Sequence, residues 1–447
     1  MTLTSNPSTK MELLGASFAA LDGNHLSYCI LTGCDDYPSA VNSDVDFMVS
    51  QSELVNLPKV IATLAGDTGS SLVQVLQHET GAYYFVLAKA DADTVVFLHL
   101  DASSDFRRMG RLWLTAEQMF ARRRYDARGF YVAADDDAFI YYLIKKIDKG
   151  TLDEPQALKL RNLFNNAPEA CLARARQFWS VASGELFKRT FSTGNFIALQ
   201  ASLPSLAKEL RASAPLENIW RRTAQFAKEL TRRFNRVRRP TGLFVVFLGP
   251  DGSGKSSVIE QITQTMLPAF RRSEYFHLRP SRGSGANQKT AVVTDPHGQA
   301  SRGFLGSTAK LIYLVGDYTL GYLLKVRWLL VRSSLVVFDR YYHDLLVDPI
   351  RYRHRGPLWL VRFIGKLVPK PDLLILLDAP AEVLQERKQE VPYEETSRQR
   401  DAYRKLVASF PNGVIVDASR PLPEVVNSVN IAILRYLEKR TRARLKL

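Results

Sequence analysis

The stretch "VVFLGPDGSGKSSVIEQI", residues Val245 to Ile262, decides the fold of the second half of the chain. It opens with four apolar residues and continues into a glycine-rich turn, so the pattern predicts a buried strand that ends abruptly. Behind the turn, apolar residues recur at helical spacing at Val258, Ile259, Ile262 and Met266. We therefore expect a strand, a glycine-rich loop and a helix in direct succession.

The loop in this stretch fits the phosphate-binding pattern G-x-x-x-x-G-K-[ST] at every required position. Its glycines let the backbone approach a ligand closely, so that successive amides point at phosphate oxygens beside a helix N-terminus. Lys255 is expected to reach the β- and γ-phosphates of ATP, and the Ser256 hydroxyl is expected to ligate Mg2+. The candidate ATP-binding residues are Gly249, Asp251, Gly252, Ser253, Gly254, Lys255, Ser256 and Ser257.

The sequence around the loop alternates apolar runs with helical patterns over residues 240–447. Several of these runs are continuously apolar, as is typical of a parallel sheet that is covered on both faces. We predict an α/β domain with a doubly wound, parallel five-stranded sheet. The expected strands are 243–248, 274–278, 335–339, 373–378 and 414–417.

One of the expected strands leads into Asp339 and Arg340 within "SLVVFDRYYHDLL", residues 334–346. Ligands of open α/β sheets collect at the carboxyl ends of the strands, so Asp339 is placed to hold Mg2+ or to orient an acceptor. The planar guanidinium of Arg340 matches phosphate oxygens, and we expect it to point toward the acceptor. The alternative is that the two residues form only a structural salt bridge.

These motifs resemble the thymidylate kinase-like branch of the P-loop nucleoside monophosphate kinases. The resemblance rests on "GPDGSGKSS", on "DRY" at 339–341, on "PDLLILLDAPAEVLQERKQE" at 371–390 and on "VIVDASRPLPEVVNSV" at 414–429. It implies transfer of the γ-phosphoryl group of Mg-ATP to a nucleoside monophosphate beneath a closing lid. The catalytic residues that it implies are Lys255, Asp339, Arg340 and the lid residue Arg387, with Lys388, Arg398 and Arg400 as further cations near the lid.

The acceptor side of the sequence departs from the thymidylate kinase pattern. The Arg-Glu-Pro turn of those kinases is replaced by Arg279 and Pro280 without an acidic residue, and their thymine-recognising segment is replaced by "YHDLLVDPIRYRHRGP". A site that recognises a base by hydrogen bonds depends on its own donors and acceptors, so we predict weak or absent activity on dTMP. Candidates for a different acceptor site are His343, Asp344, Asp348 and Arg351.

A second pattern lies in the first half, in "LTGCDDYPSAVNSDVDFMVS", residues 31–50. Asp44 and Asp46 are separated by one residue, so their side chains point to the same face of a strand. Asp101 ends the apolar run "TVVFLHLD" and offers a third carboxylate. Carboxylates in this arrangement can share Mg2+ ions for in-line attack on a nucleotide α-phosphate.

This second pattern resembles the nucleotidyltransferase (polymerase-beta-like) superfamily. The resemblance implies an α+β nucleotidyltransferase-like domain over residues 12–150, with Asp44, Asp46 and Asp101 as metal ligands. One position departs, because Cys34 stands where the superfamily usually has Gly or Ser beside the incoming triphosphate. Two alternatives stay open, namely an inactive relic of such a domain and plain surface acids at the edge of a strand.

Between these two domains the sequence predicts a helical region and a basic linker over residues 151–239. The linker ends in the basic run "RRTAQFAKELTRRFNRVRR", residues 221–239, and Pro240 and Gly242 mark the boundary. Such a run is usually a solvated helix face, and binding to an anionic surface is the other interpretation. The P-loop thymidylate kinase-like domain is expected to occupy residues 240–447.

Composition favours a globular enzyme with anionic partners. The chain has 447 residues, 46% hydrophobic content and a formal net charge of +15, which suits nucleotides, nucleic acid or anionic lipid headgroups as partners. Three cysteines match no zinc pattern and no disulfide framework, so the reducing cytoplasm is the expected compartment. The N-terminal residues indicate no signal peptide, and the most apolar window, residues 304–331, carries too many charges for a membrane span.

The leading hypothesis is therefore an ATP-dependent phosphotransferase with a nucleotide and a small-molecule acceptor as partners, fused to a nucleotidyltransferase-like domain. An ATP-sensing switch protein without turnover is one alternative. A kinase and nucleotidyltransferase that process nucleic-acid ends is another, which the basic runs favour weakly. Association into a homodimer is left open.

Overall fold

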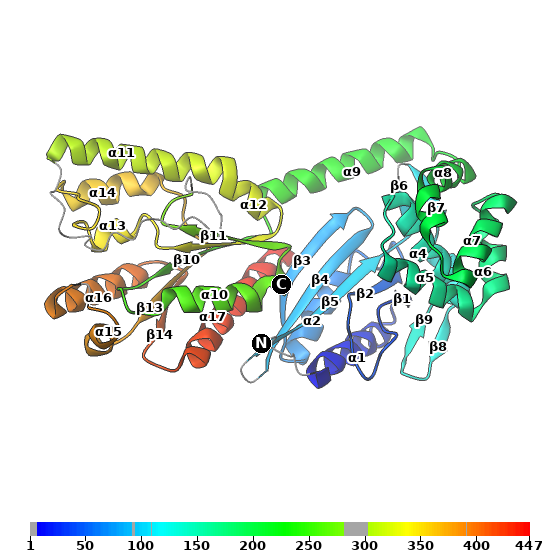
Figure 1. Ribbon diagram of the computed structural model, residues 1–447, viewed down its shortest axis with the longest axis horizontal. Coiled ribbons are helices and arrows are strands. Elements are labelled where there is room, and N and C mark those ends of the chain that lie inside the picture. The colour runs from blue at the N-terminus through cyan, green and yellow to red at the C-terminus, as the bar shows by residue number, and fades with distance from the viewer. Residues whose placement is uncertain (1–6, 92–93, 109, 281–302, 390) are drawn as a thin grey trace. The chain divides into compact units, whose positions relative to one another are not determined.

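The structure is a computed structural model of the 447-residue chain and describes residues 7–91, 94–108, 110–280, 303–389 and 391–447. The chain divides into two compact units (Figure 1). We call the described residues within 7–89, 96–232 and 441–447 the N-terminal unit. The C-terminal unit is built mainly of residues 233–440.

The core of the C-terminal unit is a five-stranded sheet in the order β11-β12-β10-β13-β14. Every neighbouring pair is parallel, and the three central strands are buried along their whole length. The prediction of a parallel five-stranded sheet is confirmed, with strand ends within two residues of those expected. The strands are β10 (Leu243–Leu248), β11 (Arg272–His277), β12 (Ser334–Asp339), β13 (Leu373–Asp378) and β14 (Gly413–Asp417).

Helices cover both faces of this sheet, as Figure 1 shows for α11 and α14 on one side and α10 and α17 on the other. One face packs Phe244, Val246 and Phe338 of the strands against Leu311 and Tyr318 of α11. The helices are α10 (Lys255–Met266), η1 (Leu267–Ala269), α11 (Phe304–Gly321), the π-helical η2 (Tyr322–Val326), α12 (Arg327–Val331), α13 (Asp344–Val347), α14 (Leu358–Ile364), η3 (Gly365–Leu367), α15 (Ala381–Arg387), α16 (Tyr393–Ala408) and α17 (Leu422–Leu445).

The strand order places β10 at the point where the chain switches direction across the sheet. β10 lies between β12 and β13. The chain therefore builds the sheet first on one side of β10, with β11 and β12, and then on the other side, with β13 and β14. In open α/β sheets the crevice at such a switch point, outside the carboxyl ends of the strands, is the ligand site. The glycine-rich loop follows β10 directly and therefore lies at this position.

The N-terminal unit contains a mixed seven-stranded sheet in the order β3-β4-β5-β2-β1-β9-β8. β1 pairs antiparallel with β2, whereas β2 pairs parallel with β5, so the unit is of α+β type. A two-stranded sheet of β6 and β7 accompanies it. The strands are β1 (Tyr28–Thr32), β2 (Val45–Val49), β3 (Ser71–Glu79), β4 (Ala82–Asp91), β5 (Thr94–Ser103), β6 (Phe106–Arg108), β7 (Arg111–Leu114), β8 (Arg124–Asp126) and β9 (Phe130–Val132).

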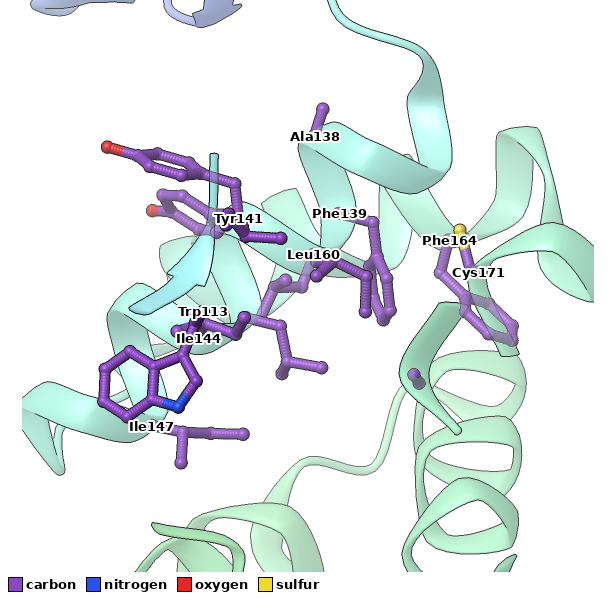
Figure 2. Close-up of a cluster of buried hydrophobic side chains, with 14 of the residues drawn as sticks. Trp113, Ala138, Phe139, Tyr141, Ile144, Ile147, Leu160, Phe164 and Cys171 are labelled. Carbon is purple, nitrogen blue, oxygen red and sulfur yellow. The ribbon is translucent and has the colours of Figure 1, made fainter. Parts of the chain in front are cut away.

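The helical region after residue 150 shares a hydrophobic core with the strands before it. Figure 2 shows Trp113 and Phe139 in one buried cluster with Leu160, Phe164 and Cys171. The expected boundary at residue 150 therefore falls inside a common core. The helices of this unit are α1 (Pro7–Gly23), α2 (Leu57–Asp67), α3 (Ala116–Ala121), α4 (Asp135–Lys149), α5 (Glu154–Asn166), α6 (Pro168–Ala175), α7 (Val181–Thr193) and α8 (Ile197–Ser213).

The predicted basic linker is a single helix, α9 (Ile219–Arg238), which Figure 1 shows as unbroken. Its first 14 residues belong to the N-terminal unit, since the division of the chain falls between Arg232 and Arg233. Across the described residues, none of the helices combines the length and the low charge that a membrane crossing requires.

Candidate functional site

The loop after β10 has the backbone conformation that its glycines predict. Gly249, Gly252 and Gly254 adopt φ angles of 150°, 83° and 79°, which side-chain-bearing residues rarely adopt. A Cβ atom built on Gly252 would lie 2.8 Å from the carbonyl oxygen of Leu384, whereas one on Gly254 would meet nothing within 4 Å. The loop is thus packed on one side and open at the N-terminus of α10, where an anion would bind.

Lys255 is buried at this N-terminus, and its ammonium group is held by the loop itself. Nζ donates to the carbonyl oxygens of Gly249 and Pro250 at 2.8 Å each, and to Ser253 Oγ at 3.3 Å. Burial, with help from the nearby Arg340 guanidinium, lowers the pKa of Lys255 to about 8. The lysine is therefore in place for bound phosphates, whose charge would favour its protonated form.

Asp339 ends β12 beside the phosphate-binding loop, since its register partner on β10 is Phe247. The side chain is buried, and Tyr275 donates to Oδ2 at 3.3 Å, with His277 Nδ1 at 3.6 Å. Burial acts to raise the pKa of this carboxyl group, but the hydrogen bond from His277 and the charge of Lys255 outweigh it, so the pKa lies below its ordinary value. The group is a carboxylate at neutral pH.

The other oxygen of Asp339, Oδ1, is buried and has no hydrogen-bond partner among the residues that the structure describes. Buried carboxylate oxygens are normally satisfied, so this atom marks a place for a cation or a donor. Ser256 lies in the first turn of α10 with its side chain exposed. These two oxygen donors fit Mg2+, which typically takes only one or two protein ligands together with substrate phosphates.

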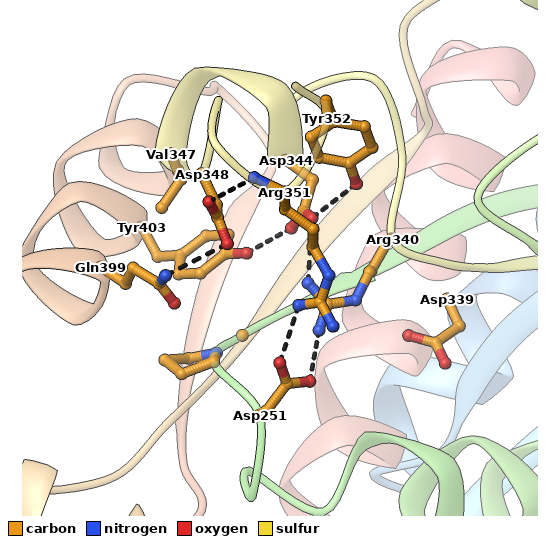
Figure 3. Close-up of polar contacts among 12 residues, drawn as sticks. Asp251, Asp339, Arg340, Asp344, Val347, Asp348, Arg351, Tyr352, Gln399 and Tyr403 are labelled. Carbon is orange, nitrogen blue, oxygen red and sulfur yellow. Dashed lines mark hydrogen bonds and ion pairs between the residues drawn. The ribbon is translucent and has the colours of Figure 1, made fainter. Parts of the chain in front are cut away.

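Arg340 does not extend freely toward an acceptor in this structure. Its guanidinium is buried between two carboxylates, with Nη2 on Asp251 Oδ1 of the loop and Nη1 on Asp344 Oδ2 at 2.9 Å (Figure 3). Its φ of 65° is unusual for a residue with a side chain and costs backbone energy. The loop carboxylate of Asp251 also binds Arg351 Nη1, at 2.7 Å. Both arginines thus converge on Asp251.

Asp344, a candidate for the acceptor site, is a fully buried anchor of this network. It accepts hydrogen bonds from Tyr352 at 2.7 Å and from Tyr403, in addition to the ion pair with Arg340 (Figure 3). Burial acts to raise the pKa of Asp344, but the Arg340 charge and the two tyrosines outweigh it and the pKa is lowered. Its surroundings leave it no surface to offer a ligand.

The other three candidates for an acceptor site differ in their accessibility. Asp348 is buried and its Oδ2 accepts from Gln399 at 3.2 Å. His343 is buried against Phe410, and burial lowers its pKa to about 4, so this imidazole is neutral. Of the four candidates, only Arg351 is partly exposed, with 23% of its side chain accessible to solvent.

Arg279, which follows β11, has an acidic partner on helix α11 that the sequence patterns did not indicate. Asp317 of α11 lies with Oδ2 3.7 Å from Arg279 Nη1, and both side chains are nearly buried. Asp317 lies 38 positions after Arg279 in the sequence. No local spacing signal could have indicated this pair.

The cations near the expected lid are spread over several partners. Arg387 ends α15 and donates to the carbonyl oxygen of Ala418 at 2.8 Å. Arg398 pairs with Glu395, and Arg400 pairs with Asp378 at 2.8 Å. Lys388 is exposed. The partners of Arg387 and Arg400 are neighbours, because the backbone N–H of Ala418 donates to the carbonyl oxygen of Asp378 at 2.6 Å.

In the N-terminal unit, Asp46 and Asp101 come together on neighbouring strands. They are register partners of the parallel pair β2 and β5. Lys145 of α4 lies against both, with Nζ 2.8 Å from Asp46 Oδ1 and 4.0 Å from Asp101 Oδ2. Thr32 donates to the other oxygen of Asp46 at 2.7 Å. Sequence reasoning missed Lys145, which lies in a helix 99 positions after Asp46.

Burial and the nearby charge of Asp46 raise the pKa of Asp101 to about 7. Asp44 is more exposed than the other two and faces His99, whose Nδ1 lies 3.6 Å from Oδ1. Within the ranges that the structure describes, no group of three or more His, Cys, Asp or Glu side chains is arranged to hold a metal ion. Of the expected ligands Asp44, Asp46 and Asp101, the last two contact the ammonium group of Lys145.

The turn before this cluster has a clear steric basis. Gly33 adopts a φ of 97°, and a Cβ on it would lie 2.1 Å from the carbonyl oxygen of Asp44. Cys34 follows as a buried thiol, and its carbonyl oxygen accepts from Arg128 at 2.7 Å. The close approach of the Asp44 carbonyl oxygen explains the glycine, and the hydrogen bond from Arg128 holds the backbone at Cys34.

The parallel sheet and the phosphate-binding loop at its switch point define the C-terminal unit as a P-loop kinase type of fold. Comparison with known proteins agrees, because residues 247–429 match the family model described as thymidylate kinase. The match covers less than half of the chain and begins inside β10.

Curated relatives over the same part of the chain are thymidylate kinases. The enzyme of Leuconostoc mesenteroides is 24% identical over 219 residues, which is 45% of this chain and 100% of the relative. That of Enterococcus faecalis is 26% identical over 216 residues, 44% of this chain and 98% of the relative. That of Lactobacillus delbrueckii is 27% identical over 205 residues, 41% of this chain and 92% of the relative. The similarity supports a kinase.

Proposed function

We propose that the C-terminal unit transfers the γ-phosphoryl group of Mg-ATP to a nucleoside monophosphate or to another small phosphorylated or hydroxyl acceptor. One observation supports this above all others: a buried lysine at the N-terminus of α10 lies beside a strand-end carboxylate, Asp339, that has one unsatisfied buried oxygen. The similarity of residues 247–429 to thymidylate kinases supports the same reaction class.

Each residue of this site has a role that follows from its position. The loop amides and Lys255 bind the β- and γ-phosphates, and Ser256 and Asp339 hold Mg2+, which neutralises charge on the transferred group. Arg340, fixed between Asp251 and Asp344, supplies positive charge on the acceptor side. Arg387 stands at the end of α15 as the lid cation. Positioning and charge, rather than covalent chemistry, would account for catalysis.

We propose an acceptor other than dTMP. The relatives named above are thymidylate kinases, but the residues of this chain on the acceptor side differ in kind. Asp344 and Asp348, which follow the Asp-Arg-Tyr motif, are buried within a network of arginine, tyrosine and glutamine. Arg351 is the accessible residue of this group and favours an anionic acceptor.

A screen of ADP release tests the proposal. Purified protein would be incubated with Mg-ATP and, in turn, nucleoside monophosphates, sugars and oligonucleotides, and the same screen would be run on Lys255→Ala. We expect one acceptor class to stimulate turnover in the wild type only. Lys405→Ala removes an exposed lysine of α16 and is the matched control. Acceptor-independent ATP binding without turnover would favour the ATP-sensing switch instead.

We propose in addition that the N-terminal unit is a nucleotidyltransferase or its relic. The observation in favour is that Asp46 and Asp101 are paired across β2 and β5, with Asp44 two residues before Asp46. If the unit is active, Asp44→Asn should abolish Mg2+-dependent nucleotidyl transfer and leave ADP release by the other unit unchanged. Asp67→Asn, at an exposed position that ends α2, is the matched control. Loss of both activities together would contradict two separate sites.

Two further expectations on partners and location go with this proposal. All three cysteines are buried free thiols, which supports a reducing compartment such as the cytoplasm. The nucleic-acid end-processing alternative predicts salt-sensitive binding of single-stranded oligonucleotides. Light scattering would determine whether the chain forms a homodimer.

A further inference from the structure

Helix α9 (Ile219–Arg238) is strongly amphipathic and strongly basic. It contains seven arginine and lysine residues and one glutamate. Its large apolar side chains recur at spacings of three, four and seven residues, which places them along one stripe of the helix. They are Ile219, Trp220, Phe226, Leu230, Phe234 and Val237.

The polar side of α9, and not this apolar stripe, packs against the protein. The least exposed positions are Gln225, Glu229, Arg232 and Arg236, which follow one another at helical spacing on the other side of the helix. Glu229 accepts from the backbone of Thr80 at 3.0 Å, and Arg232 donates to the carbonyl oxygen of Gln77 at 2.9 Å, both within the N-terminal unit. Arg236 donates to the carbonyl oxygen of Val331 at 2.9 Å within the C-terminal unit.

The apolar stripe therefore faces solvent. None of the residues of α9 is buried, and the exposed fraction is 79% for Trp220, 71% for Phe226 and 59% for Leu230. A helix that only joins two units is normally polar all round, and a contiguous exposed apolar surface marks an interaction site. Because the polar side of α9 packs against the protein and the apolar stripe faces solvent, we infer that an apolar partner covers the stripe in the functional state.

We propose that α9 binds the surface of an anionic lipid bilayer, with its apolar stripe in the interface between headgroups and acyl chains. Tryptophan, phenylalanine and leucine on one face and arginine and lysine on the rest are the composition of such interfacial helices. Arg221, Lys228 and Arg233 are exposed on the same helix and supply positive charge to the headgroups.

Charge complementarity favours lipid over a second copy of this helix. Two α9 helices facing each other would bring together fourteen cations and two glutamates, because each contributes seven and one. Like charges placed opposite each other across an interface oppose association. An anionic lipid surface has the opposite charge, and the net charge of the whole chain, +15, acts in the same direction.

Cosedimentation with lipid vesicles tests this proposal on the full-length protein. The probes are vesicles of phosphatidylcholine alone and vesicles that also contain phosphatidylglycerol, each at low and at physiological salt. We compare the wild type with Phe226→Ser/Leu230→Ser, which replaces two exposed side chains of the apolar stripe. Val181→Ser/Ile197→Ser changes two exposed apolar residues of α7 and α8 and is the matched control.

The wild type and the control should sediment with the anionic vesicles and only weakly with the neutral ones. The Phe226/Leu230 variant should lose about tenfold or more of this binding and keep its ADP release, because two large side chains leave the interface. The proposal is overturned if the wild type ignores anionic vesicles, or if the variant binds them as well as the control. It is also overturned if light scattering shows that the double substitution only dissociates a dimer, or if oligonucleotides are bound and vesicles are not.

Discussion

At the residue scale, the site combines a glycine-rich loop with ion pairs of Arg340 to Asp251 and Asp344. Gly249 to Ser256 form a local pattern whose spacing determines the chemistry. The direction in which the Arg340 side chain points depends on the positive φ of this residue and on its ion pairs with Asp251 and Asp344. This network of ion pairs forms only in the folded protein. A sequence pattern that predicts an arginine near a phosphate therefore cannot show that two carboxylates bind the arginine.

Substitution of Asp344 tests how far this network stabilises the fold. Asp344→Ala would leave the buried Arg340 charge with one partner fewer and two tyrosine hydroxyls without an acceptor. We expect a loss of about 3–5 kcal/mol in the free energy of unfolding of the C-terminal unit, measured by chemical denaturation. Asp401→Ala, an exposed position of α16, is the control and should cost almost nothing. Equal stability of the two variants would show that the network is not structural.

The low pKa of Lys255 predicts how ATP binding depends on pH. The free protein loses the Lys255 proton near pH 8, because burial lowers the pKa from 10.5 to about 8. Bound phosphates favour the charged ammonium, so binding takes up a proton above that pH and becomes weaker as the pH rises. The Mg-ATP affinity should fall by about tenfold per pH unit above pH 8. Titration calorimetry from neutral to alkaline pH measures it, and a flat profile that Lys255→Ala shares would contradict the assignment.

At the element scale, continuous apolar runs predicted the three central strands β10, β12 and β13 well, because these strands are buried on both faces. The N-terminal unit was harder to predict. Its short strand β9 pairs with β1, which is far away in sequence, and the helices α5 to α8 share a core with elements that precede residue 150. The apolar spacing of Leu158, Leu160 and Leu163 indicated a helix but not the elements against which it packs. Tertiary packing, which local patterns do not encode, decided that the helical region joins the N-terminal unit.

The conformation of the loop after β10 makes a prediction at the same scale. Gly252→Ala would place a methyl group 2.8 Å from the carbonyl oxygen of Leu384 at a φ of 83°. The loop would have to shift, and we expect Mg-ATP affinity to fall by about tenfold or more while circular dichroism stays unchanged. Gly316→Ala lies inside α11 with open space around it, so this control should keep its ATP affinity. Normal ATP binding by Gly252→Ala would contradict the loop geometry.

At the scale of the whole molecule, the chain combines a kinase-type unit with an α+β unit whose acidic cluster holds a lysine. If the two sites are separate, Mg-ATP should protect only one of them. We expect hydrogen exchange with and without Mg-ATP to slow in β10, the following loop and α10, and to be unchanged around Asp46 and Asp101. The Lys255→Ala variant should show no such protection. Protection that spreads equally over both units would contradict separate sites.

The most direct test of the central claim follows the γ-phosphoryl group itself. ATP labelled at the γ-phosphate would be incubated with the protein, Mg2+ and the acceptor found in the ADP-release screen, and the products would be separated. With the wild type the label should move into the acceptor, and with Lys255→Ala it should stay in ATP. Label that stays in ATP with every acceptor, or transfer that survives the loss of Lys255, would contradict phosphoryl transfer at this site.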